Sequence, residues 1–161
     1  WQVARAVETS GALGLERVIS TQSEYNALSR AAEDELVPCC TEYGVGIMAY
    51  HPLDSGFLTG KYRRNQPPPD QSRMFHVPSI AQSLLTDPRF ELAERLESFA
   101  AERGHSLLEL AIGWLLARPA VDCAVIGASR NGQVATNVAA SGWVLSTDEM
   151  RAVDQLLTTT G

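Results

Sequence analysis

Short apolar runs alternate along this chain with longer stretches whose apolar residues recur at helical spacing. Residues 45–50, VGIMAY, are almost continuously apolar, which is typical of a strand buried on both faces of a parallel sheet. Residues 121–129, VDCAVIGAS, predict another strand and the loop that leaves it, and Val18, Ile19 and Thr21 predict an earlier one. Because strands separated by helices imply a parallel sheet with crossover connections, the expected fold class is α/β.

Helices are expected between and after these strands, and several carry their own start and stop signals. Ser106 with Glu109 and Ser146 with Glu149 form capping boxes, since each serine can accept from a backbone N–H while its glutamate reaches back. Gly44 supplies a C-terminal stop. The expected helices cover residues 1–9, about 31–43, the stretch around 92–99, the stretch from 106 to Pro119, about 131–140 and the stretch after 146.

Residues 51–88 separate the second predicted strand from the later helices. This segment holds most of the prolines, including Pro67, Pro68 and Pro69, and shows no sustained periodicity. It therefore predicts a long loop, which in a compact domain is usually functional or disordered.

Composition excludes several classes of protein. A chain of 161 residues with 45% hydrophobic residues can bury the core of one domain, and its formal net charge of −6 disfavours nucleic acid as a partner. Adjacent Cys39 and Cys40 and a distant Cys123 match neither a disulfide framework nor a metal-ligand spacing, so no metal site is expected. Without a signal sequence or a long apolar run, we expect a cytoplasmic protein and no membrane partner.

Ligands of parallel α/β sheets bind beyond the carboxyl ends of the strands, which directs attention to the loops after Gln22, Tyr50 and Ile126. After Ile126, Gly127 permits close approach of the backbone, and the following helix offers free N–H groups to an anion. Arg130 adds a planar guanidinium suited to a phosphate. The same pattern is also typical of an ordinary tight turn between a strand and a helix.

The loop after Tyr50 could hold the other parts of a nucleotide. Tyr50 offers a flat apolar ring at the end of a strand, while Ser55, Gly56 and Lys61 offer donors and charge to a diphosphate. The amide of Gln22 both donates and accepts, as a carboxamide partner requires. The alternative is that Tyr50 is a core aromatic and Lys61 a solvated loop charge.

Four segments taken together resemble one family. QSEYNALSR, EYGVGIMAYHPLDSGFLTGKY, LAIGWLLARP and IGASRNGQVATN are similar to the C-terminal half of the aldo-keto reductases, in the same order and at similar separations. The resemblance covers nearly the whole chain and implies part of a (β/α)8 TIM barrel, about the last three βα units and the C-terminal helix. Residues 1–161 would then be the C-terminal portion of one barrel domain, with 51–88 as its long cofactor and substrate loop.

The resemblance also implies an activity and a cofactor. The family transfers a hydride between a nicotinamide, usually NADPH, and a carbonyl, so an NADPH-dependent reduction of aldehydes or ketones to alcohols is expected. Gln22 would then hold the nicotinamide carboxamide, Tyr50 would stack on the ring, and Arg73 would help to close the loop over NADP(H). The diphosphate would be lined by His51, Pro52, Leu53, Ser55, Gly56 and Lys61. The 2′-phosphate and adenine would be bound by Gly127, Ser129, Arg130, Gln133 and Asn137.

No catalytic residue is assigned to this chain. The family's tetrad of Asp, Tyr, Lys and His comes from the N-terminal half of the barrel, and neither Tyr25 nor Tyr43 lies in the matching context. Three strands cannot close an eight-stranded barrel, and Trp1 already lies in a helical pattern. We therefore expect an inactive segment whose partners are the N-terminal half of the same barrel and a small carbonyl substrate.

Two other hypotheses remain. A non-catalytic sensor or subunit derived from the same fold would bind nucleotide without turning over a carbonyl, as some barrel relatives associated with ion channels do. Another phosphate-binding α/β protein is the third hypothesis, which the matches at Gln22 and Tyr50 disfavour.

Overall fold

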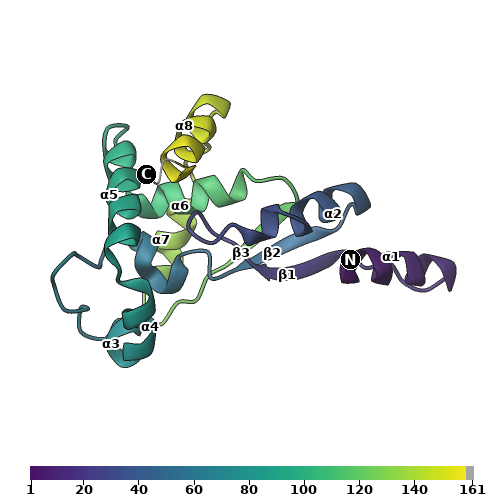
Figure 1. The fold of residues 1–161 in the computed structure, drawn as a ribbon, viewed down its shortest axis with the longest axis horizontal. Helices are drawn as coiled ribbons and strands as arrows, with labels where there is room; N and C mark the ends of the chain where they lie inside the picture. The colour runs from purple at the N-terminus through teal and green to yellow at the C-terminus, as the bar shows by residue number, and fades with distance from the viewer. Residues whose placement is uncertain (159–161) are drawn as a thin grey trace.

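The computed structural model describes residues 1–158, in which three parallel strands are combined with helices (Figure 1). The strands are β1 (Ser20–Glu24), β2 (Gly46–Tyr50) and β3 (Val121–Val125). The α-helices are α1 (Gln2–Ala12), α2 (Leu36–Tyr43), α3 (Arg73–His76), α4 (Pro78–Leu84), α5 (Asp87–Ala101), α6 (Leu107–Leu116), α7 (Gln133–Ala140) and α8 (Thr147–Thr158). Two 3-10 helices, η1 (Ala31–Glu33) and η2 (Asp54–Thr59), complete the described chain.

The sheet has the order β1-β2-β3, and both pairs of neighbours are parallel. Gln22 lies opposite Met48, while Tyr50 lies opposite Glu24 on one side and Val125 on the other. All three carboxyl ends therefore point to the same edge of the sheet. The predicted α/β class with parallel strands is confirmed.

The two faces of the sheet have different environments. In β2, Ile47 and Ala49 are 0% exposed, whereas Met48 and Tyr50 are 38% and 36% exposed. Successive side chains of a strand point to opposite faces, so the helices cover one face and leave the other open. The prediction that this strand is buried on both faces is thus wrong for the described residues.

The main core lies between the covered face of the sheet and helices α5, α6 and α8. Helix α6 is buried on most of its surface, and its Trp114 contacts the ring of Tyr25 edge to face at a centroid distance of 5.7 Å. A smaller cluster of Cys40, Val45 and Ile47 packs α1 and α2 against the sheet. Figure 1 shows α1 at one end of the long axis and α3, α4 and α5 at the other.

Both predicted capping boxes form. Ser106 Oγ accepts from the N–H of Glu109 at 3.2 Å while the Glu109 carboxylate accepts from the N–H of Ser106 at 2.7 Å. Ser146 and Glu149 make the same pair of contacts, at 3.3 and 2.7 Å. These two helix starts were correctly predicted because capping depends on residues only three positions apart.

Longer-range predictions needed correction. Residues 51–88 are not a single irregular loop, because η2, α3, α4 and the start of α5 lie within them. The strand expected around Val18 begins only at Ser20, and the helix expected over residues 31–43 is divided into η1 and α2. Pro78 and Pro88 occupy the first turns of α4 and α5, where a missing N–H costs nothing.

Candidate functional site

Three loops meet at the carboxyl edge of the sheet. The side chains of Gln22 and Glu24 share the open face with Met48 and Tyr50, because their registers match across β1 and β2. Tyr50 presents its ring on this open face and is not a core aromatic. The structure therefore brings Gln22 and Tyr50 to the same face and the same edge.

Asn26, which the sequence reasoning did not single out, joins the loops after β1 and β2. Its side chain is fully buried. Its Oδ1 accepts from the N–H of Leu28 at 2.8 Å and from the N–H of Ser29 at 2.9 Å. Its Nδ2 donates to the carbonyl of His51 at 3.0 Å. The N–H of Tyr25 also donates to the carbonyl of Tyr50 at 3.3 Å. The signal available in the sequence was an asparagine two residues after a strand, because asparagine side chains often bond to the backbone of a turn.

The loop after β2 turns back on itself through left-handed backbone. The φ angles are +53° at His51, +49° at Asp54, +56° at Ser55 and +86° at Gly56. A side chain at Gly56 would place its Cβ 2.6 Å from the Nζ of Lys61, so the ammonium group rests directly against this glycine. Ser55, Gly56 and Lys61 are thus adjacent in space as well as in the predicted motif.

The remaining predicted residues of this loop have different environments. Pro52 and Leu53 are both buried, and Leu53 belongs to the main core. His51 is exposed, with its Nδ1 4.0 Å from the Oε1 of Glu24 and its ring 5.2 Å from that of Tyr50. His51 and Glu24 therefore form a polar border beside the Tyr50 ring.

The loop after β3 arranges its N–H groups around one oxygen atom. The Oε1 of Gln133 accepts from the backbone N–H of Ser129 at 2.7 Å and of Arg130 at 2.9 Å. Both N–H groups precede α7 and point at the same oxygen, so in this structure the side chain of Gln133 satisfies them. Asn137 lies one turn further along α7, on the same side of the helix as Gln133. A Cβ at Gly127 would meet nothing within 4 Å, which leaves open space there.

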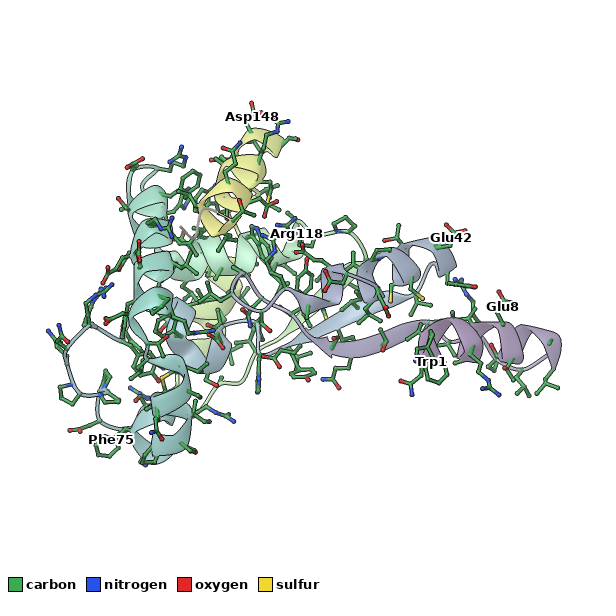
Figure 2. All side chains as sticks on the ribbon, in the orientation of Figure 1. Trp1, Glu8, Glu42, Phe75, Arg118 and Asp148 are labelled. Carbon is green, nitrogen blue, oxygen red and sulfur yellow. The ribbon has the colours of Figure 1, made fainter. Side chains whose placement is uncertain are left out.

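Arg130 connects this loop to the segment before α3. Its guanidinium donates to the carbonyl of Gln71 at 3.5 Å, across 59 positions of sequence. Arg73 begins α3 two residues later, after Ser72, whose buried Oγ accepts from the N–H of Phe75 at 3.3 Å. Figure 2 shows Phe75 far from Trp1, on the side of the molecule where the strands' carboxyl ends lie.

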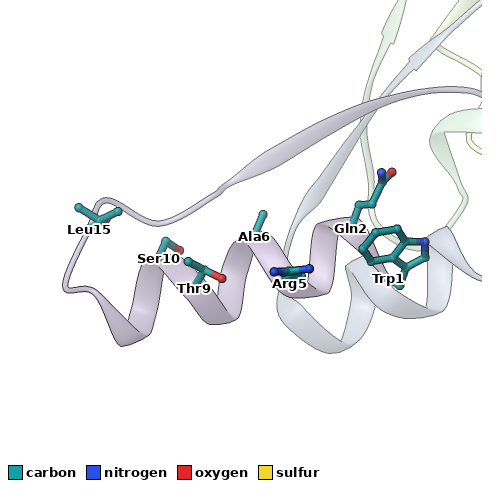
Figure 3. A pocket seen from close by; sticks show the side chains of 7 residues that line it. All are labelled: Trp1, Gln2, Arg5, Ala6, Thr9, Ser10 and Leu15. Atoms are coloured by element: carbon teal, nitrogen blue, oxygen red, sulfur yellow. The ribbon is translucent and has the colours of Figure 1, made fainter.

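Two surface hollows differ in their relation to these residues. One of about 520 Å³ lies beside the end of β1 and is lined by Tyr50 and by the acidic side chains of Glu24, Asp34 and Glu35. The other, of about 370 Å³, lies along α1 (Figure 3), where Trp1 and Arg5 line it with Leu15 from the following loop. Only the first adjoins the predicted site.

The described residues contain neither a metal-binding cluster nor a helix that could span a membrane. Within residues 1–158, no group of three or more His, Cys, Asp or Glu side chains is placed to hold a metal ion. No helix in that range is both long enough and apolar enough to cross a membrane.

Known proteins match this chain over most of its length. The model of the Aldo/keto reductase family matches residues 2–158. A probable voltage-gated potassium channel subunit beta from Oryza sativa subsp. japonica is 34% identical over 86% of this chain and 43% of its own length. L-glyceraldehyde 3-phosphate reductase from Escherichia coli (strain K12) is 35% identical over 83% of this chain and 40% of its own.

The structural comparison agrees with the sequence comparisons. The glycerol dehydrogenase of Gluconobacter oxydans has a TM-score of 0.71 and 29% identity, over 86% of this chain and 42% of that one. The chain thus spans less than half the length of the relatives it matches, and its three parallel strands fit part of a TIM barrel. The chain belongs to the aldo/keto reductase family.

Proposed function

We propose that this chain forms the dinucleotide-binding part of an NADP-dependent oxidoreductase that reduces aldehydes or ketones to alcohols. The observation that carries the proposal is that Gln22 and Tyr50 share the open face near the carboxyl edge of the sheet. The loops that follow β2 and β3 from this edge carry Lys61, which lies against Gly56, and Arg130, which lies against Gln71. Family membership supports an oxidoreductase, and the identity of the nucleotide is part of the proposal.

The chemistry of the converging groups suits the parts of a dinucleotide. The exposed ring of Tyr50 would stack on the nicotinamide, with the amide of Gln22 bound to the carboxamide. Lys61, Ser55 and the backbone around Gly56 would hold the diphosphate. When bound, the nicotinamide would supply the hydride.

The 2′-phosphate would lie between the loop after β3 and the turn at Gln71. Arg130 would contact it through its guanidinium and Ser129 through its hydroxyl, while the Gln133 side chain holds the backbone N–H groups of both residues. Arg73 would help to close the segment over the cofactor. Gly127 would leave room for the ligand, and Asn137 would contact the adenine.

The proton donor would come from outside this chain. We propose that the N-terminal half of the same barrel packs on the open face of the sheet and supplies the Asp, Tyr, Lys and His of the family. The open face supports this arrangement, because Met48, Tyr50 and Val125 remain 36–40% exposed in the described residues. A small carbonyl would then bind between this face and the added half.

A fluorescence titration of the full-length protein tests the cofactor site. We expect Arg130→Ala to raise the Kd for NADPH by about tenfold to a hundredfold, since a hydrogen bond to a charged group contributes about 1.5–3 kcal/mol. The Kd for NADH should stay the same, because NADH lacks the 2′-phosphate. Arg151→Ala, at an exposed arginine of α8, is the matched control. Equal NADPH affinity in wild type and Arg130→Ala would contradict the assignment.

A second candidate function is a nucleotide-binding subunit without catalysis. The similarity to a probable potassium channel subunit beta favours it. This alternative predicts that NADPH binds to the full-length protein while no aldehyde or ketone accelerates its oxidation. Carbonyl-dependent loss of absorbance from NADPH would exclude it.

A further inference from the structure

The start of η2 contains a buried charge in an unusual backbone conformation. Asp54 is 5% exposed and has a φ of +49°, and it is followed by Ser55 at +56° and Gly56 at +86°. Left-handed backbone is costly for residues other than glycine unless the surrounding structure holds it. Two consecutive non-glycine residues in this conformation therefore require a stabilising contact from elsewhere in the fold.

Arg89 provides that contact from the first turn of α5. Its guanidinium donates to the Oδ2 of Asp54, and the two side chains are only 23% and 7% exposed. The same guanidinium lies over the ring of Phe57, 5.6 Å from its centroid, and Phe57 packs against Phe90 at 5.2 Å. Arg89 thus holds η2 through both its charge and its stacking contact.

The charges around this ion pair make the two residues depend on each other. Burial lowers the pKa of Arg89, and the carboxylate of Glu24 at the end of β1 acts in the opposite direction. Removing one member of a buried pair leaves the other charge uncompensated in a poorly solvated place. The Asp54–Arg89 pair therefore links α5 to η2, and the negative charge of Glu24 on β1 also favours the charged form of Arg89.

We propose that Arg89, acting through Asp54, is a positioning residue for the diphosphate part of the cofactor site. With Asp54 fixed, Ser55 and Gly56 keep their left-handed turn, and the Lys61 ammonium keeps its place against Gly56. Neither member of the pair contacts the ligand in this arrangement. The inference rests on the proposed function and adds to it the group that preorganises the loop.

Two nucleotide ligands separate this role from a general effect on folding. In the full-length protein, Asp54→Ala and Arg89→Met should each raise the Kd for NADPH by at least about tenfold, as expected for breaking a buried ion pair. The Kd for 2′-AMP should change by less than about twofold, because that ligand would reach only the Arg130 side. The Kd of the double variant for NADPH should be no higher than the higher of the two single-variant values, because both substitutions break the same contact.

Substitutions at Asp54 separate charge from backbone conformation. Asp54→Gly loses the carboxylate but tolerates a positive φ, so it should retain more NADPH affinity than Asp54→Ala. Arg89→Lys keeps the charge and should partly restore binding relative to Arg89→Met. Arg64→Met is the matched control, because Arg64 also pairs with α5, through Asp87 and Glu94, at a more exposed position.

Hydrogen exchange gives a readout that does not require nucleotide. Faster exchange confined to residues 54–61 in Asp54→Ala and Arg89→Met would support the positioning role, whether or not NADPH binds. Failure of the wild-type protein to bind NADPH would overturn the proposed function and not the positioning role. The inference is overturned if both variants bind NADPH as wild type does. It is also overturned if exchange rises throughout the protein, or if 2′-AMP is weakened as much as NADPH.

Discussion

At the scale of single residues, Gly56 is where a small change should have a large effect. A Cβ at this position would lie 2.6 Å from Nζ and 3.0 Å from Cε of Lys61, and its φ is +86°. We expect Gly56→Ala to lower the free energy of unfolding by about 1–2 kcal/mol through backbone strain and to displace Lys61. Urea denaturation measures the first effect. Gly11→Ala is the control, since no atom lies within 4 Å of its Cβ; a similar loss there would contradict the explanation.

Asn26 gives a second prediction at this scale. Asn26→Ala would leave the N–H groups of Leu28 and Ser29 and the carbonyl of His51 without their partner. An unsatisfied buried polar group costs about 1–3 kcal/mol, so the free energy of unfolding should fall by at least that amount. Asn26→Asp keeps the two acceptor contacts and should lose less. Chemical denaturation measures this loss. Equal stability of Asn26→Ala and wild type would show that the hydrogen bonds of Asn26 between the two loops do not stabilise the fold.

At the scale of elements, the capping box of α6 makes stability depend on pH. Hydrogen bonds from the backbone of Ser106, then from its side chain and from His105, lower the pKa of Glu109 from 4.5 to about 2. A carboxyl whose pKa is lower in the folded state stabilises the fold above its unfolded pKa, and this contribution is lost as the pH falls from 4.5 towards 2. Wild type should therefore lose stability over this window more steeply than Glu109→Gln.

Denaturation in urea at a series of pH values checks this prediction. Glu91→Gln, on the exposed side of α5, is the control and should follow the wild-type curve. Parallel curves for wild type and Glu109→Gln between pH 4.5 and 2 would mean that the capping carboxylate does not contribute.

The elements also show which features are readable from sequence. The strand at VGIMAY, both capping boxes and the stop at Gly44, whose φ is +60°, depend on neighbouring residues, and they were predicted correctly. The short helices within residues 51–88 were missed, because α3 has only four residues and η2 is held by Arg89, 35 positions from Asp54. The exposure of one face of β2 was missed because it depends on what covers the sheet.

The candidate site divides in the same way. The predicted positions of Gln22, Tyr50 and Lys61 at one edge follow from strand order and the rule that parallel strands end together. The contacts of Asn26 and Arg89 do not, because each joins segments far apart in sequence whose approach only the folded chain determines.

At the scale of the whole molecule, the described chain leaves apolar surface and strand edges uncovered. Both β1 and β3 are edge strands, and Val134 and Val138, one turn apart on α7, are 64% and 66% exposed. Such surfaces associate with other chains unless something covers them. We expect a polypeptide limited to residues 1–158 to self-associate as its concentration rises, and the full-length protein not to do so through these surfaces.

Light scattering coupled to size-exclusion chromatography measures this difference. Val134→Lys combined with Val138→Lys should reduce the association of the short polypeptide, because both side chains are exposed on α7. A short polypeptide that stays monomeric at all concentrations, with native circular dichroism, would contradict the proposal that another half covers the sheet.

We propose that the carboxyl ends of these three strands together bind one dinucleotide. A crystal structure of the full-length protein grown with NADPH tests it most directly. We expect the nicotinamide on the ring of Tyr50, the diphosphate beside Lys61 and the 2′-phosphate at Arg130. A nucleotide bound elsewhere, with these three side chains contacting no part of it, would contradict the claim.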